Sequence, residues 1–228
     1  MLEELKQHVF QANMDLVKHN LVKFTWGNVS GIDRKKGFVV IKPSGLPYEN
    51  MHAKDMVVVD FEGKVVDSKF KPSSDTATHL VLYKHFAEIK GVVHTHSPWA
   101  VTWAQAGLSI PALGTTHADH FNGSIPCTRK LIQSEIEQSY EHSTGEVIVE
   151  TFKNIDHQAI PSVLVNCHGP FSWGNSPDDA VINSVLLEEV AKIAYHTMTL
   201  RKVKPIDTFL LDKHYNRKHG NKAYYGQK

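Results

Sequence analysis

Strand-like and helix-like segments are interleaved along this chain, and that mixture limits the folds it can adopt. Residues 38–41 form a short apolar run that ends at the turn residues Pro43-Ser44-Gly45, which is typical of a buried strand. Residues 56–60 and 65–66 flank a glycine-containing turn, which predicts a hairpin. Hairpins mixed with helices predict a layered α/β fold whose sheet is mainly antiparallel, rather than a regular βαβ repeat.

The helix-like segments carry recognisable periods and starting signals. Residues 2–16 repeat apolar side chains every three or four positions, which is typical of a helix with one buried face. Ser176-Pro177 followed by two aspartates predicts the start of a helix that runs to about residue 200. The remaining patterns predict helices at 76–86, from 98 onward, at 128–140 and at 207–219, and strands at 92–97, 146–150 and 163–166.

Composition excludes several classes of function. The 228 residues fit one domain, 1–228, and the formal net charge of +1 argues against a nucleic-acid or anionic-membrane partner. No run of 18 apolar residues predicts a membrane-spanning helix, and the charged first residues do not resemble a signal peptide. The two cysteines are too few for a disulfide framework, so we expect a reduced, cytoplasmic protein.

The pair His94 and His96 is the clearest chemical signal. On a strand, residues i and i+2 face the same side, so both imidazoles would point in one direction. His168, in a turn before a glycine, is a candidate third ligand, and three histidines with an open position are typical of a catalytic zinc site. The alternative is that these are ordinary surface or core histidines. The neighbouring Cys167 is interpreted as core packing rather than as a ligand.

Two further groups of polar residues carry weaker signals. Small and hydroxyl residues, with one lysine, stand at loops and helix starts, where backbone N–H groups favour anions. These residues therefore predict a phosphate site. They are Gly27, Asn28, Lys42, Ser44, Gly45, Ser73 and Ser74. Their alternative is simple helix capping. Asp119 lies among histidines in a glycine-bounded loop, which could carry out proton transfer. The alternative, which this motif by itself favours, is an ordinary solvated loop.

Many short motifs, in this order, resemble the class II aldolase/epimerase family along nearly the whole chain. The resemblance is carried by 25–30 (TWGNVS), 41–45 (IKPSG), 71–76 (KPSSDT), 93–97 (VHTHS), 114–119 (GTTHAD), 125–129 (IPCTR), 168–171 (HGPF), 211–215 (LDKHY) and 222–226 (KAYYG). It implies a three-layer α/β/α fold with a central, mainly antiparallel sheet between helices, and a sugar-phosphate enzyme. It also implies a homotetramer with active sites at the subunit interfaces.

The resemblance assigns roles to particular residues. His94, His96 and His168 match zinc ligands, and Asp75 matches the acidic residue at the metal. The seven small, hydroxyl and lysine residues named above match substrate and phosphate positions. Asp119 and Tyr225 match an acid/base pair that the neighbouring subunit supplies, and His214 matches a further histidine near the site.

One position separates branches of the family. Aldolases that this chain resembles carry glutamate where it has Asp75, and the aspartate together with Tyr224-Tyr225-Gly226 points to the epimerase branch. That branch inverts C4 of a pentulose phosphate by breaking and remaking the C3–C4 bond, in pentose catabolism. An aldolase that releases the aldehyde fragment, and a non-catalytic binding domain like that of adducin, are the alternatives.

Overall fold

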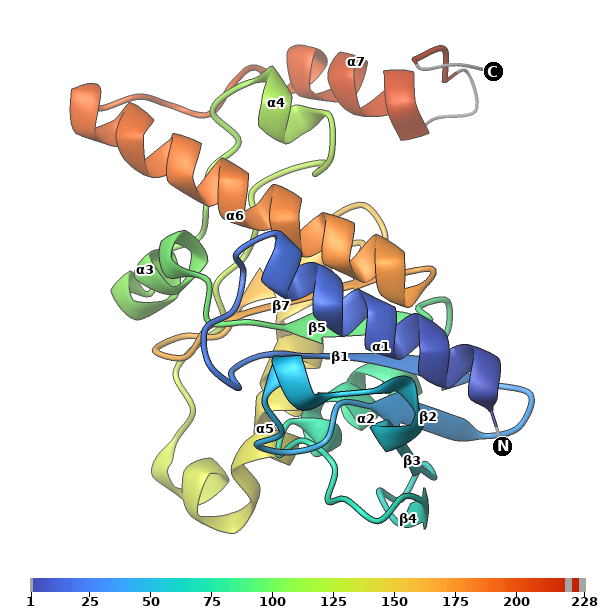
Figure 1. Ribbon diagram of the computed structural model, residues 1–228. Helices are drawn as coiled ribbons and strands as arrows, with labels where there is room; N and C mark the ends of the chain where they lie inside the picture. The colour runs from blue at the N-terminus through green and yellow to red at the C-terminus, as the bar shows by residue number, and fades with distance from the viewer. Residues whose placement is uncertain (1, 220–222, 226–228) are drawn as a thin grey trace.

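The computed structural model describes residues 2–219 and 223–225, which form one sheet with helices on both of its faces (Figure 1). The strand order in this seven-stranded sheet is β4-β3-β2-β1-β5-β7-β6. Each neighbouring pair in that order is antiparallel. The expected α/β architecture with an antiparallel sheet is therefore confirmed.

Strands and helices are interspersed along the described chain. The strands are β1 (Asn28–Asp33), β2 (Phe38–Ile41), β3 (Val57–Val59), β4 (Val65–Asp67), β5 (Gly91–His94), β6 (Ser162–Leu164) and β7 (Pro170–Gly174). The helices are α1 (Glu3–Lys18), α2 (Thr76–His85), α3 (Pro98–Ala106), α4 (Thr115–Ala118), α5 (Gln133–Thr151), α6 (Pro177–Leu200) and α7 (Thr208–His219), with short 3-10 turns at Tyr48–Asn50 and Ala53–Asp55.

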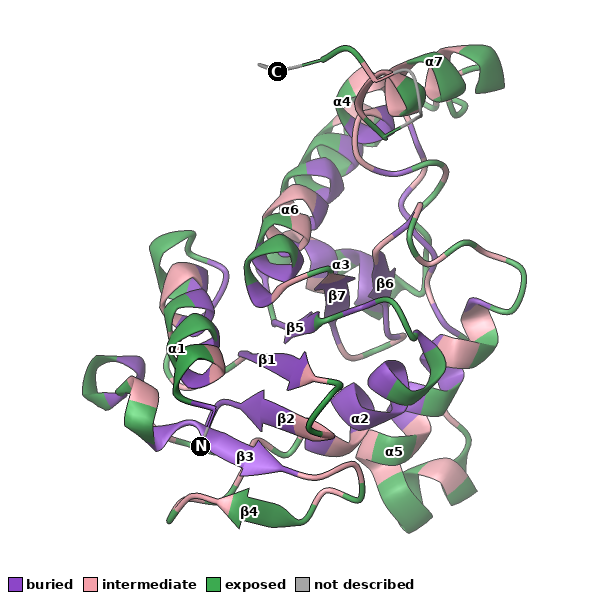
Figure 2. Cartoon of the chain, turned by 90° about the vertical axis from the view of Figure 1, so that its right-hand side faces the viewer, coloured by how far each residue is buried: buried purple, intermediate pink, exposed green. Residues whose placement is uncertain are grey.

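Two hydrophobic cores lie on the two faces of the sheet, and β3 shows how the strands serve both. Val58 packs in the core under α1, whereas Val57 and Val59 pack in the core with α2 and α5. Successive side chains of a strand point to opposite faces, so a strand covered on both faces is apolar at every position. Figure 2 shows the purple, buried strands between α1 on one side and α2 with α5 on the other.

The helix predicted at Ser176 begins there for a local reason. The Ser176 hydroxyl accepts a hydrogen bond of 3.0 Å from the backbone N–H of Asp179, and Pro177 occupies the first turn. A serine cap satisfies a backbone donor that has no partner within the helix. The start of α6 lies against Gly91 of β5, where a side chain would collide with its backbone.

The predicted strand at 146–150 is wrong, because these residues belong to α5. Within α5, Thr144, Gly145, Val147 and Ile148 are buried, which is a helical and not an alternating pattern. A Cβ on Gly145 would come within 2.6 Å of the Val81 side chain, so the close packing of α5 on α2 requires glycine. This contact between distant residues overrides the strand preference of the valine-rich run.

Other boundaries also differ from those predicted. The helix expected at 128–140 begins only at Gln133, and Ser139 interrupts α5 with a non-helical conformation. The strand expected at 92–97 ends at His94, and β1 and β7 were not predicted. Gly31 and Ser30 weaken the strand signal of β1, which is formed because two neighbouring strands pair with it. Among the described helices, none combines the length and hydropathy needed to span a bilayer.

Candidate active site

A pocket of about 430 Å³ opens where β1 begins and β5 ends, beside the first residues of α2. It brings together most of the residues singled out in the sequence. The residues from that set that line it are Gly27, Asn28, Lys42, Ser44, Gly45, Ser73, Ser74, Asp75, His94, His96 and His168. Segments that are far apart in the chain therefore meet in one cavity.

Three histidines form a compact cluster in this pocket. His94 is the last residue of β5, His96 follows two residues later, and His168 lies in the turn between β6 and β7. The Nε2 atoms of His94 and His96 are 3.0 Å apart. One ligand nitrogen from each of the three histidines lies within 4.8 Å of the other two, and among the described residues no other group of potential metal ligands is as compact. Such spacing suits one metal ion.

The rings of His94 and His168 are held through Nδ1, which leaves their Nε2 atoms available to a metal. The Nδ1 of His94 donates to the carbonyl oxygen of Pro170 at 2.9 Å, and the ring stacks on Phe171 with centroids 4.2 Å apart. The Nδ1 of His168 lies 3.2 Å from the Tyr140 hydroxyl. A hydrogen bond at one ring nitrogen sets the tautomer and directs the other nitrogen, which is the usual arrangement of metal-binding histidines.

The protonation states also fit a metal site. Burial, reinforced by the nearby rings of His94 and His96, lowers the pKa of His168 to about 3. Burial and the neighbouring His94 also lower the pKa of His96. Neutral imidazoles are the form that binds a divalent transition metal. The donor set is therefore suited to such an ion.

Asp75 lies at the start of α2, beside the histidines but outside the group of three. Its Oδ2 accepts a 2.6 Å hydrogen bond from the Asn28 amide. Burial by itself would raise the pKa of Asp75, but the neighbouring His94 and His79 and the bond from Asn28 bring that pKa below its ordinary value. The side chain is thus a half-buried, ionised carboxylate at the edge of the cluster.

The other side of the pocket is suited to an anion. Ser73 and Ser74 stand just before α2, and Gly45 has a left-handed φ of 65° that glycine adopts at little cost. Lys42 is buried over the Tyr48 ring, with Nζ 4.8 Å from the ring centroid. Burial lowers the pKa of Lys42 to about 8, so the amine is mostly charged at neutral pH.

Asp119, His214 and Tyr225 do not line this pocket. They lie together around α4 and α7, at one end of the molecule (Figure 1). The Asp119 carboxylate is 2.9 Å from His214 Nδ1 and accepts a 2.6 Å bond from Arg217. The Arg217 guanidinium lies 5.0 Å from the centre of the Tyr225 ring. The two residues of the predicted acid/base pair therefore lie near each other, but they lie outside the histidine pocket of their own chain.

The charge state of Asp119 follows from these contacts. Burial by itself would raise the pKa of Asp119, but the hydrogen bonds from Arg217 and His214 and the nearby Lys218 lower it to about 2. Asp119 is consequently an ionised ion-pair partner that attaches α7 to α4 in this chain.

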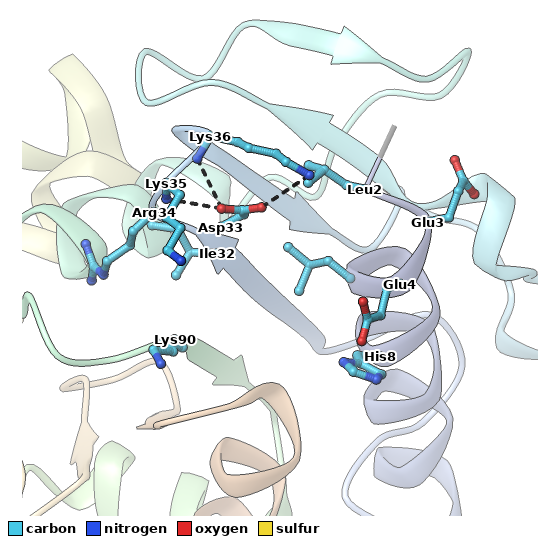
Figure 3. Close-up of a pocket in the computed structure, with 11 residues that line it drawn as sticks. Leu2, Glu3, Glu4, His8, Ile32, Asp33, Arg34, Lys35, Lys36 and Lys90 are labelled. Atoms are coloured by element: carbon cyan, nitrogen blue, oxygen red, sulfur yellow. Dashed lines mark hydrogen bonds and ion pairs between the residues drawn. The ribbon is translucent and has the colours of Figure 1, made fainter.

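A larger cavity of about 530 Å³ lies elsewhere, at the start of α1 and the turn after β1 (Figure 3). Its Arg34 guanidinium is already committed to the backbone carbonyls of Tyr83, Phe86 and Ile89. Lys36 pairs with Asp33 at 3.7 Å. The potential metal ligands line the smaller pocket, which is therefore the candidate active site despite its smaller volume.

Sequence reasoning did not single out five residues that line the pocket, namely Thr25, Trp26, Pro43, Tyr140 and Glu141, and it misjudged Cys167, which precedes His168. Trp26, at the pocket edge, lies 5.9 Å from the His96 ring, and Tyr140 follows the interruption in α5. A tyrosine just after a broken helix gives no specific signal in one sequence. Cys167 is exposed in a left-handed turn conformation, so the core-packing interpretation was wrong. The turn that presents His168 also turns Cys167 outward.

The geometry defines a class of protein: an α/β domain with a three-histidine pocket beside a loop of small and hydroxyl residues suited to an anion. The sequence matches the family described as Class II Aldolase and Adducin N-terminal domain over residues 7–195, and the chain belongs to that family.

Solved structures share the fold at low sequence identity. An L-fuculose 1-phosphate aldolase is 22% identical with a TM-score of 0.80, over 94% of this chain and 95% of that one. The L-fuculose 1-phosphate aldolase from Glaciozyma antarctica PI12 is 16% identical with a TM-score of 0.77, over 97% and 84%. YgbL from Escherichia coli, a putative aldolase/epimerase/decarboxylase, is 20% identical with a TM-score of 0.74, over 92% and 97%.

Proposed function

We propose that this protein is a zinc-dependent L-ribulose-5-phosphate 4-epimerase, whose single domain spans residues 1–228. It interconverts L-ribulose 5-phosphate and D-xylulose 5-phosphate by breaking and remaking the C3–C4 bond, in the catabolism of L-arabinose, L-ascorbate or a related pentose source. The observation that carries the proposal is one pocket in which three clustered histidines and the ionised Asp75 stand beside a loop of small and hydroxyl residues suited to an anion.

His94, His96 and His168, with Asp75 beside them, are the residues that would hold the zinc ion. When bound, zinc supplies Lewis-acid stabilisation of the negative charge that develops on the substrate oxygens during cleavage. Ser73, Ser74 and the backbone around Gly45 bind the phosphate, with the Lys42 amine adding positive charge. Holding the phosphate keeps the aldehyde fragment in the pocket until the C3–C4 bond forms again.

Inversion at C4 needs a proton acceptor on one side of the aldehyde and a donor on the other. We assign these roles to Asp119 and Tyr225 of a neighbouring copy in a homotetramer, with His214 beside them. The assignment is supported by the separation of these residues from the pocket of their own chain, and by the exposure of the Tyr225 ring. A site assembled from two copies would be inactive in the monomer.

The alternative within the family is an aldolase that releases its aldehyde, because L-fuculose 1-phosphate aldolases are among the similar structures. The shorter acid at position 75, held by Asn28, favours the epimerase. A non-catalytic domain like that of adducin is the second alternative, but a cluster of three histidines with the spacing of metal ligands would serve no purpose there.

A coupled assay on the purified, zinc-loaded protein tests the proposal. L-ribulose 5-phosphate is supplied, and D-xylulose 5-phosphate and free glycolaldehyde phosphate are followed together, with and without a chelator. The epimerase gives chelator-sensitive xylulose phosphate with little free aldehyde. Free aldehyde as the main product would identify an aldolase, and no turnover after metal is restored would favour a binding domain.

Lys42→Met is expected to raise the KM for the sugar phosphate about tenfold, because a buried cation beside the anion loop is lost. The wild-type KM should also rise above about pH 8, where the Lys42 amine loses its proton and its charge. Initial rates between pH 7 and 9.5 measure both effects. A variant with the wild-type KM, or with the same rise above pH 8, would show that Lys42 does not contact the phosphate.

Asp119→Asn is expected to lower kcat by about 100-fold while bound zinc stays unchanged, because the substitution removes a proton acceptor but touches no proposed ligand. Activity and metal content are measured on the same preparation. Loss of zinc in this variant would instead give Asp119 a structural role. Asp178→Asn, on the exposed first turn of α6, is the matched control.

A further inference from the structure

The side chain of Tyr140 enters the pocket from a break in α5. Ser139 has a non-helical backbone, with φ of -164° and ψ of 75°, so the helix stops and starts again at this residue. Tyr140 follows directly, and it lines the pocket together with His168. A break leaves backbone groups without their helical partners, so it persists only where other contacts hold the chain.

Two threonine hydroxyls hold the backbone at this break. The Thr78 hydroxyl of α2 donates to the carbonyl oxygen of Glu141 at 2.6 Å. The Thr144 hydroxyl donates to the carbonyl oxygen of Tyr140 at 2.8 Å. Both threonines are 1% exposed, so water does not compete for these bonds. The helix after the break is thus anchored on α2, whose start lies beside the pocket, and Tyr140 has a fixed place there.

The Tyr140 hydroxyl has one hydrogen-bond partner in the described part of the chain, which is Nδ1 of His168 at 3.2 Å. The two rings are tilted by 37°, with their centroids 5.8 Å apart. A phenolic hydroxyl can accept one hydrogen bond and donate another. The direction of the bond between Tyr140 and His168 therefore depends on which ring nitrogen of the histidine carries the proton.

Metal binding by His168 would fix that direction. Because Nδ1 faces Tyr140, Nε2 is the nitrogen left to join the cluster with His94 and His96. A ring nitrogen that binds a metal uses its lone pair and carries no proton, so the proton of the ring is on Nδ1. Nδ1 then donates to the Tyr140 oxygen. The hydroxyl proton of Tyr140 is left without an acceptor among the described residues, on a side chain that lines the pocket.

We propose that Tyr140 positions His168 for the metal by accepting its Nδ1–H, and that the Tyr140 hydroxyl thereby donates its own proton in a hydrogen bond to an oxygen of the bound sugar phosphate. Without the metal, the hydroxyl is free to donate to Nδ1 instead, so the donor for the substrate becomes available together with the metal. The inference rests on the metal site of the proposed function. It adds a donor from the same chain to the acid/base pair of the neighbouring copy.

Zinc affinity, measured without any substrate, gives the first test. Tyr140→Phe keeps the ring and removes the hydroxyl, and it is expected to bind zinc about tenfold more weakly, because the ligand histidine loses the partner that orients it. Competition with a chromophoric chelator measures the dissociation constant. Tyr195→Phe is the matched control, since it removes the hydroxyl of a partly exposed tyrosine of α6 outside the pocket.

The outcomes of this measurement separate the inference from the proposed function. Wild-type zinc affinity in Tyr140→Phe would overturn the positioning role while leaving the metal site in place. A wild-type protein that binds no zinc would overturn the inference and the proposed function together. Unfolding midpoints of the metal-free proteins show whether the variant is folded as the wild type is.

The proton on His168 gives a second test, which uses the wild-type protein. Protein labelled with ¹⁵N at histidine is titrated with zinc, and the His168 signals are identified by their absence from the metal-free His168→Gln variant. The inference requires a protonated Nδ1 and an unprotonated, zinc-bound Nε2 at saturation. An unprotonated Nδ1 in the zinc-loaded protein would overturn it, whatever the activity of the enzyme is.

Donation to the substrate is tested at saturating zinc, where a weaker metal affinity no longer limits the rate. In the coupled assay, Tyr140→Phe is expected to lower kcat at least about tenfold, because a donor to a charged substrate oxygen is lost. Tyr195→Phe should keep the wild-type kcat. A zinc-saturated Tyr140→Phe enzyme with the wild-type kcat and KM would overturn the donation to the substrate. If the wild type does not turn over this substrate, the proposed function fails, and the zinc and ¹⁵N measurements still decide the positioning role.

Discussion

Replacing His94 by alanine is expected to abolish metal binding and to lower kcat/KM by at least about 10³-fold. His94 is 2% exposed, and its free nitrogen is 3.0 Å from that of His96. Two histidines remaining from a set of three hold a divalent ion much more weakly. Loss of a Lewis acid that contributes several kcal/mol corresponds to a rate factor of this size.

The zinc content per chain is measured by elemental mass spectrometry, and the coupled assay is then run on the same sample. His142→Ala is the matched control, because His142 is an exposed histidine of α5 outside the pocket. The control should keep its metal and its activity. A His94→Ala protein with the wild-type zinc content would show that the three histidines are not the metal site.

Replacing Gly91 by alanine is expected to lower the free energy of unfolding by about 3 kcal/mol, which is a large effect for one added methyl group. A Cβ at Gly91 would collide with the carbonyl oxygen of Ser176 and lie 2.6 Å from Pro177 Cα. These are backbone atoms at the capped start of α6, so they cannot rotate away as a side chain would. The strand that carries His94 would have to separate from α6.

Urea unfolding of the metal-free proteins measures this difference without a contribution from bound zinc. Gly114→Ala is the control, because a Cβ there meets no heavy atom within 4 Å and the backbone is extended. Its stability should stay within about 0.5 kcal/mol of the wild type. Equal unfolding midpoints for Gly91→Ala and the wild type would show that α6 does not pack on β5 at this contact.

Much of the fold was predictable where the cause is local. The period of α1, the serine and proline at the start of α6 and the hairpin of β3 and β4 depend on residues close together in the chain. Each element was predicted because capping, turn formation and amphipathic spacing act within a few residues. The pairing of His94 with His96 is equally local, and it survives although β5 ends at His94.

The helix at 146–150 shows where local preference fails. A valine-rich run favours a strand. Gly145, however, allows α5 to approach Val81 of α2 closely, and the side chains buried along that contact stabilise the helix instead. The strand β1 was missed for the opposite reason, since its pairing partners β2 and β5 lie elsewhere in the chain. Such contacts cannot be read from neighbouring residues.

The amino-acid sequence by itself determined which chemical groups this protein brings to its site: imidazoles, an aspartate, hydroxyls and a lysine. Only the tertiary structure decided how they are used. It places Asp75 against Asn28 and buries Lys42 over Tyr48. It also pairs Asp119, at the end of α4, with Arg217 of α7, away from the histidines of its own chain. The physical reason is that side-chain identity sets what a group can do, whereas burial and partners from distant segments set its charge, its orientation and its neighbours.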